Sequence, residues 1–141
     1  MTNQSEKPHG WDTLRVMVLA GGVLLALGTL LPWISITIPL NGNEISRSGM
    51  DLTQSDALIM MGAGGGAALI ALLDRRALAN RILIVVLGLA GGGLTAFHIH
   101  EMHQRVEAAN AEMPNMATLG FGLYACAIGA LLLVVGPFTK R

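Results

Sequence analysis

The sequence has little charge, one cysteine and few aromatic residues, and these shortages exclude several classes of protein. Only 13% of its residues are charged, against about 25% in an average soluble domain. Basic and acidic residues number 9 each, so the chain has no net positive charge with which to bind nucleic acid. The single cysteine, Cys126, cannot form a disulfide within the chain, which excludes a disulfide-stabilised secreted module.

Apolar residues, by contrast, are abundant. They make up 52% of the 141 residues, and the mean hydropathy is +0.58, which excludes a disordered chain. A soluble domain of this size could not bury so much apolar surface, because small domains expose a large share of their surface. We therefore expect residues 1–141 to form one domain of an integral membrane protein.

Four apolar runs divide the chain, and each is as long as a transmembrane helix. They are Leu14 to Ile34, Ala57 to Leu73, Ile82 to Ile99 and Leu119 to Phe138. Helices of about 17 to 21 residues are roughly 25–31 Å long, close to the hydrocarbon thickness of about 30 Å. The third helix is expected to continue out of the membrane, because no helix breaker occurs before Pro114. The sequence predicts an all-α bundle of four transmembrane helices at 14–34, 57–73, 82–112 and 119–138.

Lysine and arginine are distributed unequally among the segments that join these runs. Seven of the 9 lie in the N-terminal tail, the 74–81 turn and the C-terminal tail, whereas Arg47 and Arg105 lie in the other loops. Cytoplasmic loops carry the excess of basic residues in membrane proteins. We therefore expect a multi-pass protein of the plasma (inner) membrane with both termini in the cytoplasm.

The first extracytoplasmic loop has the pattern of a β-hairpin. Residues 34–38 alternate and are rich in β-branched side chains, and Asn41-Gly42 follows as a strong hairpin signal. We expect strands near 34–39 and 43–48. Trp33, at the end of the first apolar run, is expected to lie in the aromatic belt of the membrane interface rather than to stack on a ligand.

Of the 18 glycines, 15 lie within the apolar runs. Small residues let helix backbones approach closely in lipid, and this packing drives helix association. Gly62 and Gly66 in the second run have small-xxx-small spacing, and so have Gly88 and Gly92 in the third. We expect these two pairs to face each other, because a short turn makes the two helices antiparallel neighbours. The alternative is that they hold a lipid or a quinone, or receive a helix of a partner protein.

Histidines on the outer part of the third helix are the sharpest chemical feature. His100, His103 and Glu107 share one helical face, and two imidazoles and a carboxylate could bind zinc. The alternative is a solvated polar face. His98, nearer the membrane, could bond a quinone head group or a haem propionate, or a loop carbonyl instead. We expect no resident cofactor.

The end of the first run, Leu31-Pro32-Trp33, leads into the hairpin loop, and the last run contains Gly129-Ala130-Leu131-Leu132-Leu133-Val134-Val135-Gly136. In these features the chain resembles small four-span membrane proteins that are frequent in actinobacterial genomes. It is also loosely similar to the claudin-type topology, although the loop lacks the paired cysteines of that type. The resemblance implies a role in the cell envelope and supplies no catalytic residues.

No catalytic motif and no ionisable group occurs in the middle of the four runs, which argues against an enzyme, a pump or an ion-coupled transporter. We expect a non-catalytic accessory or structural subunit of a larger respiratory or transport complex. Its partners would be membrane lipids and other integral membrane subunits, in a hetero-complex or a homo-oligomer, and not nucleic acid. The alternative is a small-ligand binder that uses the outer histidines for metal, haem or quinone.

Overall fold

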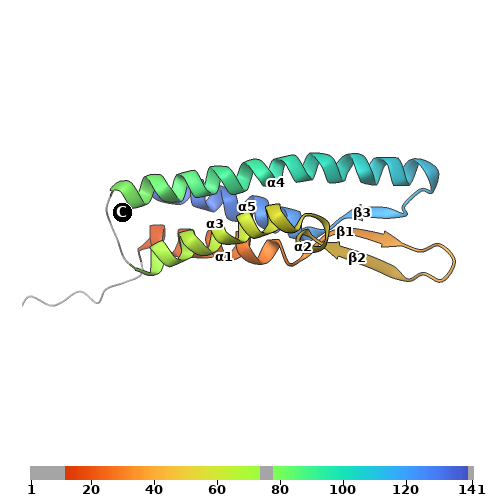
Figure 1. The fold of residues 1–141 in the computed structure, drawn as a ribbon, viewed down its shortest axis with the longest axis horizontal. Coiled ribbons are helices and arrows are strands. Elements are labelled where there is room, and N and C mark those ends of the chain that lie inside the picture. Colours follow the sequence, from red (N-terminus) through yellow and green to blue (C-terminus); the bar gives the residue numbers. More distant parts are fainter. Residues whose placement is uncertain (1–11, 74–77, 140–141) are drawn as a thin grey trace, which may run out of the picture.

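The computed structural model describes residues 12–73 and 78–139. The helices are α1 (Thr13–Gly28), α2 (Gly49–Leu52), α3 (Gln54–Leu72), α4 (Leu78–Glu112), α5 (Phe121–Val135) and the 3₁₀ turn η1 (Gly136–Phe138). The strands are β1 (Pro32–Thr37), β2 (Glu44–Ser48) and β3 (Ala117–Leu119). The molecule is elongated, with α1, α3, α4 and α5 bundled at one end and the three strands at the other (Figure 1).

Three helices are long and apolar enough to cross a membrane: α3, α4, and α5 together with η1. Helix α1 is also apolar, but its 16 residues give a length of only about 24 Å. These lengths support a multi-pass membrane protein. The fourth span stays a prediction.

The first helix ends at Gly28 and not at Ile34, so its predicted C-terminal boundary was wrong. Pro32 explains the end, because it has no N–H with which to bond the carbonyl of Gly28. The indole Nε1 of Trp33 donates to that carbonyl instead, at 3.0 Å. The β-branched residues that follow enter β1 rather than another helical turn.

The predicted hairpin is present, and a third strand completes the sheet in the order β2-β1-β3. Both pairings are antiparallel, and β3 pairs Leu119 with Ile34 and Ala117 with Ile36. The last helix therefore begins at Phe121 rather than at Leu119, because residues 117–119 serve as strand. A lone hairpin is marginally stable in water, and β3 supplies the additional pairing that the hairpin needs.

Helix α4 continues beyond the bundle to Glu112, as predicted, and its outer part lies beside the sheet (Figure 1). Asn110 fastens the two together. Its side-chain amide donates to the carbonyl of Ala117 and accepts from the N–H of the same residue, each at 2.9 Å. The sheet and the outer part of α4 therefore form one cap at the end of the bundle (Figure 1).

Glycines pack the helices together, but not at the predicted pairs. A Cβ built at Gly62 meets nothing within 4 Å, and one at Gly66 meets only a Leu87 methyl at 3.8 Å. Gly88 packs instead against α5, and Gly92 lies 3.4 Å from the Cβ of Ala130, also on α5. The prediction that these two pairs face each other was therefore wrong, because the rotation of each helix turns its glycines elsewhere.

Most of the close glycine-to-backbone contacts between helices involve α1. Gly22 of α1 meets Gly64 of α3, and Gly21 meets Gly129 of α5, where a Cβ on Gly21 would lie 2.8 Å from the Gly129 carbonyl oxygen. Helix α1 thus packs against both α3 and α5, and α4 packs against the same two helices. Since lipid gives no hydrophobic force between helices, such close packing holds the bundle together.

Candidate functional site: a buried polar network at the base of the cap

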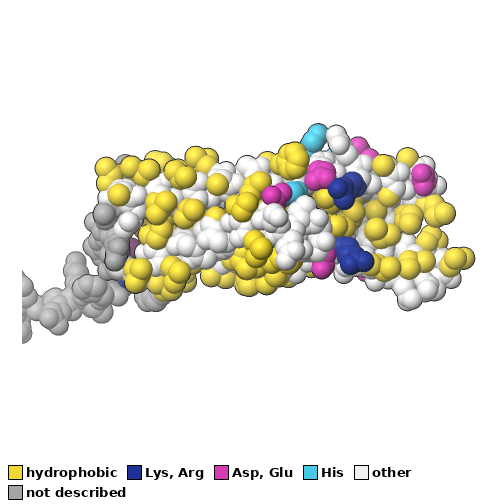
Figure 2. All heavy atoms as spheres, viewed as in Figure 1, with side chains coloured by type: hydrophobic (Ala, Val, Ile, Leu, Met, Phe, Trp, Pro, Cys, Tyr) yellow, Lys and Arg dark blue, Asp and Glu magenta, His cyan; other side chains and the backbone are white. Residues whose placement is uncertain are grey.

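Charged and histidine side chains gather where α4 leaves the bundle and meets the sheet, whereas the surface over the bundle is mostly apolar (Figure 2). His98 lies at this level on α4, and Arg81 lies near the other end of the same helix. The two are about 17 residues apart, or roughly 25 Å along the axis. That spacing is close to the hydrocarbon thickness of about 30 Å, so the polar level of His98 fits a membrane boundary.

His98 is the centre of the polar network. Its side chain is only 1% exposed, although histidine is more often partly solvated. The ring contacts two aromatic neighbours, with centroid distances of 5.1 Å to Trp33 and 5.4 Å to Phe97. The buried imidazole is thus packed against aromatic rings and reaches polar groups through its two nitrogens.

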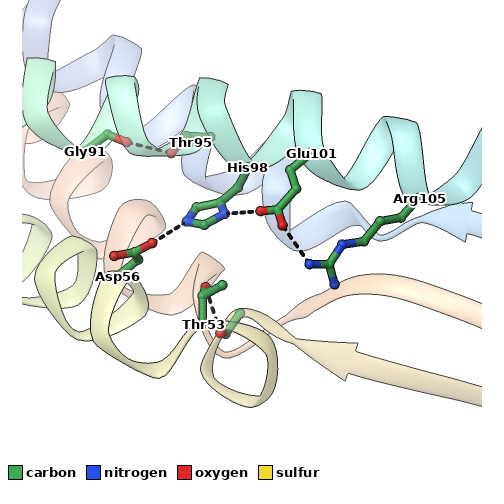
Figure 3. A network of polar contacts seen from close by, with 8 residues as sticks. Thr53, Asp56, Gly91, Thr95, His98, Glu101 and Arg105 are labelled. Atoms are coloured by element: carbon green, nitrogen blue, oxygen red, sulfur yellow. Dashed lines mark hydrogen bonds and ion pairs between the residues drawn. The ribbon is translucent and has the colours of Figure 1, made fainter.

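Both ring nitrogens point at carboxylates (Figure 3). Nε2 lies 3.0 Å from Oδ2 of Asp56, in the first turn of α3. Nδ1 lies 3.4 Å from Oε2 of Glu101, one turn further along α4, and Glu101 in turn binds Arg105 at 2.6 Å. The Asp56 contact joins α3 to α4, whereas the other contacts run along α4.

The two nitrogens of His98 are satisfied unequally. An ionised carboxylate only accepts, so Nε2 donates to Asp56, and this bond sets the tautomer of a neutral ring. Nδ1 has no hydrogen bond to any described residue, although the Glu101 carboxylate lies 3.4 Å away. The imidazole therefore has one carboxylate near each nitrogen, and Glu101 is in turn paired with Arg105.

Trp33, on β1, packs against the His98 ring. It is fully buried, so the expectation that it lies in the interfacial aromatic belt was wrong. A Cβ on Gly49 would overlap the indole ring, which requires a glycine at the start of α2. Through its bond to the Gly28 carbonyl, Trp33 connects the end of α1 to the base of the cap.

The three candidate metal ligands do not assemble around one point, although two of them form a pair. His100 bonds Gln104 at 3.1 Å, and His103 pairs with Glu107 at 3.2 Å. Within the residues that the structure describes, no group of three or more His, Cys, Asp or Glu side chains could hold a metal ion. Each histidine finds a partner one turn along an exposed helix, so the zinc site expected from the spacing is not assembled.

His98 does not bond a loop carbonyl of the described residues, which was one expectation. The other expectation was a bond to a quinone head group or a haem propionate, but the His98 side chain is buried and its nitrogens lie near Asp56 and Glu101. Three members of its network were missed: Asp56, Glu101 and Arg105. The spacing of His98, Glu101 and Arg105 along one helix carried a signal, because residues at i+3 and i+4 are neighbours. Asp56 carried none, because it is 42 residues away in sequence.

No family model and no curated protein matches the sequence. The functional argument therefore depends on the geometry of the described residues. That geometry comprises a glycine-packed apolar bundle, a cap formed by the sheet and the outer part of α4, and a polar contact between His98 and Asp56 that joins α3 to α4 at the base of the cap.

Proposed function

We propose that this protein is a non-catalytic accessory subunit of a larger membrane complex, and that it docks through an open glycine face on α3. The observation that carries the proposal is the space around Gly62 and Gly65. A Cβ built at either meets nothing within 4 Å, although α3 uses Gly64 for a close contact with α1. These two glycines therefore have no packing role inside the described part of the chain.

An open glycine face fits another helix better than it fits lipid alone. Glycine weakens a helix by about 1 kcal/mol relative to alanine in water, and in membranes its benefit is close backbone approach. Large apolar side chains, Leu58, Ile59 and Leu69, are exposed on the same helix and could flank an incoming partner. Gly93 on α4 is similarly open and offers a second point of approach.

The cap would supply the extracytoplasmic part of the interface. Leu40, at the tip of the hairpin, is 97% exposed, and Ile45 and Met113 nearby are about half exposed. Apolar side chains also gather at the far end of the sheet in Figure 2. The contact between His98 and Asp56 holds α4 against α3 where the cap begins, and Asn110 would hold the sheet against the outer part of α4.

We further propose that α1 is a fourth span and that both ends lie in the cytoplasm of a cell with an inner membrane. Helix α1 is apolar from Val16 to Gly28, and Arg15 at its start bonds the last carbonyls of α3, at 2.8 Å to Ala71. A short span is accommodated by local thinning of the bilayer. Labelling of a cysteine probe at either end from outside intact cells would contradict this topology.

The alternative function, a small-ligand binder at the outer histidines, has less support. Both nitrogens of His98 face carboxylates of this chain, and His100 and His103 have separate partners. No specific observation therefore favours it over the subunit proposal.

The test is purification of the tagged full-length chain from native membranes in a mild detergent. We expect a stoichiometric complex that Gly62→Leu dissociates, because leucine fills the proposed docking face without touching the rest of the chain. Ile128→Phe, which adds bulk to an exposed position of α5, is the matched control and should leave the complex intact. A free monomer, or a complex indifferent to Gly62→Leu, would overturn the proposal.

A further inference from the structure

A groove opens between the start of α4 and the 3₁₀ turn η1, which follows α5. It has a volume of about 280 Å³ and is lined by apolar side chains that include Ile82, Val86, Pro137 and Phe138. Ile82, Val86 and Phe138 are more than half exposed, so the groove faces the surroundings of the bundle rather than its core. In a bilayer this surface meets lipid chains.

One cationic side chain lines the same groove. Arg81 is half-buried beside the apolar residues, and no other described residue bonds or ion-pairs with it. Arg15, at the same end of the bundle, differs because its guanidinium bonds the carbonyls of Ala71 and Leu72. The groove thus combines the Arg81 guanidinium with an apolar surface that follows the first turns of α4.

The positive charge near the groove favours an anionic ligand. In the sequence, Arg75 and Arg76 come shortly before Arg81 with one acidic residue, Asp74, beside them, and Lys140 and Arg141 come shortly after Phe138. The acidic residues of the network and cap lie at the opposite end of the described bundle (Figure 2). Basic pockets between transmembrane helices at the basic side of a protein bind anionic lipid head groups. A guanidinium matches a phosphate with paired hydrogen bonds, which a partner helix made of apolar residues would not use.

We infer that the groove is a binding site for one anionic phospholipid. Its phosphate binds Arg81 at the level of the head groups, and one acyl chain lies in the channel beside Val86 and Phe138. The inference depends on the bundle lying in a bilayer, as proposed above, but not on any partner protein. A failure here would therefore leave the subunit proposal standing, and the reverse also holds.

The test is native mass spectrometry of the full chain in a mild detergent, titrated with phosphatidylglycerol or with phosphatidylcholine of the same acyl chains. We expect tighter binding of phosphatidylglycerol and an approximately fivefold weaker affinity in Arg81→Gln, since a basic residue near anionic lipid contributes about 1 kcal/mol. Arg81→Lys should retain most of the preference. Arg47→Gln, which removes an arginine from the hairpin at the other end, is the matched control and should change nothing.

A second variant tests the channel itself. Val86→Trp should lower the affinity for both lipids, because the indole would occupy the space of the acyl chain. Soluble glycerol phosphate should compete poorly, since it has no chain to place in the groove. Equal binding of the two lipids, an unchanged affinity in Arg81→Gln, or full competition by glycerol phosphate would each overturn the inference.

Discussion

Gly62 and Gly64 lie two residues apart in α3, yet a methyl group added at each would meet opposite surroundings. At Gly62 there is nothing within 4 Å. At Gly64 the added carbon would overlap the carbonyl oxygen of Gly22 and lie 2.8 Å from the backbone nitrogen of Ala26. We therefore expect Gly64→Ala to force α1 and α3 apart, and Gly62→Ala to leave the bundle unchanged.

The comparison isolates the packing energy. Both substitutions replace glycine by alanine inside the same helix, so the gain in helix propensity, about 1 kcal/mol in water, is common to both. Overpacking of a close contact costs about 1–3 kcal/mol. The contacts at Gly64 are to the backbone of α1, which cannot rotate away as a side chain can. We expect Gly64→Ala to have a free energy of unfolding about 2–3 kcal/mol lower than that of Gly62→Ala.

The assay is equilibrium unfolding in mixed micelles with an increasing fraction of a denaturing detergent. Far-ultraviolet circular dichroism follows the helices. Tryptophan fluorescence, with the second tryptophan replaced by Trp11→Phe in every variant, reports on Trp33, which is fully buried in the native state. A difference between the two variants below about 0.5 kcal/mol, the usual range of surface substitutions, would refute a backbone contact between α1 and α3 at Gly64.

Two further predictions concern polar side chains rather than glycine contacts. Asp56→Ala should lower the free energy of unfolding by about 1–3 kcal/mol, because it leaves the buried Nε2 of His98 without its acceptor. Asp56→Asn keeps an acceptor and should lose less stability. Equal stability of Asp56→Ala and the native chain would contradict this prediction. Hydrogen bonds from the backbone and the hydroxyl of Ser48 lower the pKa of the Asp51 carboxyl below 3.8. Since the folded value is the lower one, the contribution of this cap to stability is present above 3.8 and lost as the pH falls through the lowered pKa. Nuclear magnetic resonance titration should find that Ser48→Ala moves this pKa back toward 3.8, and an unchanged titration would count against the cap.

Patterns within one segment predicted most of the elements. The extension of α4 to Glu112 followed from the absence of a breaker, and the hairpin followed from alternation and Asn41-Gly42. Pro32 also carried a usable signal for the end of α1, which the long apolar run concealed. The strand β3 carried little signal, because three residues are too few to alternate visibly and their partner lies more than 80 residues away.

Spacing along one helix could not by itself predict the candidate site. Such spacing could relate His98 to Glu101 and Arg105. It also related His100, His103 and Glu107, of which the structure pairs only His103 with Glu107, on an exposed face. Both sets satisfy the same helical periodicity. Only the approach of α3 makes the first set a buried network, because that approach places Asp56 against His98 and excludes water from the ring.

The amino-acid sequence alone indicated the class of molecule, since apolar runs of span length and a shortage of charge favour a membrane protein. Tertiary structure decided which glycines touch. Spacing identifies a small face on a helix, but the rotation and neighbours of that helix select its contacts, so Gly22 meets Gly64 while Gly62 stays open. Tertiary structure likewise decided that Trp33 is buried at the base of the cap. The residues next to Trp33 in the sequence would be the same whether its side chain were buried or exposed, so they could not predict this.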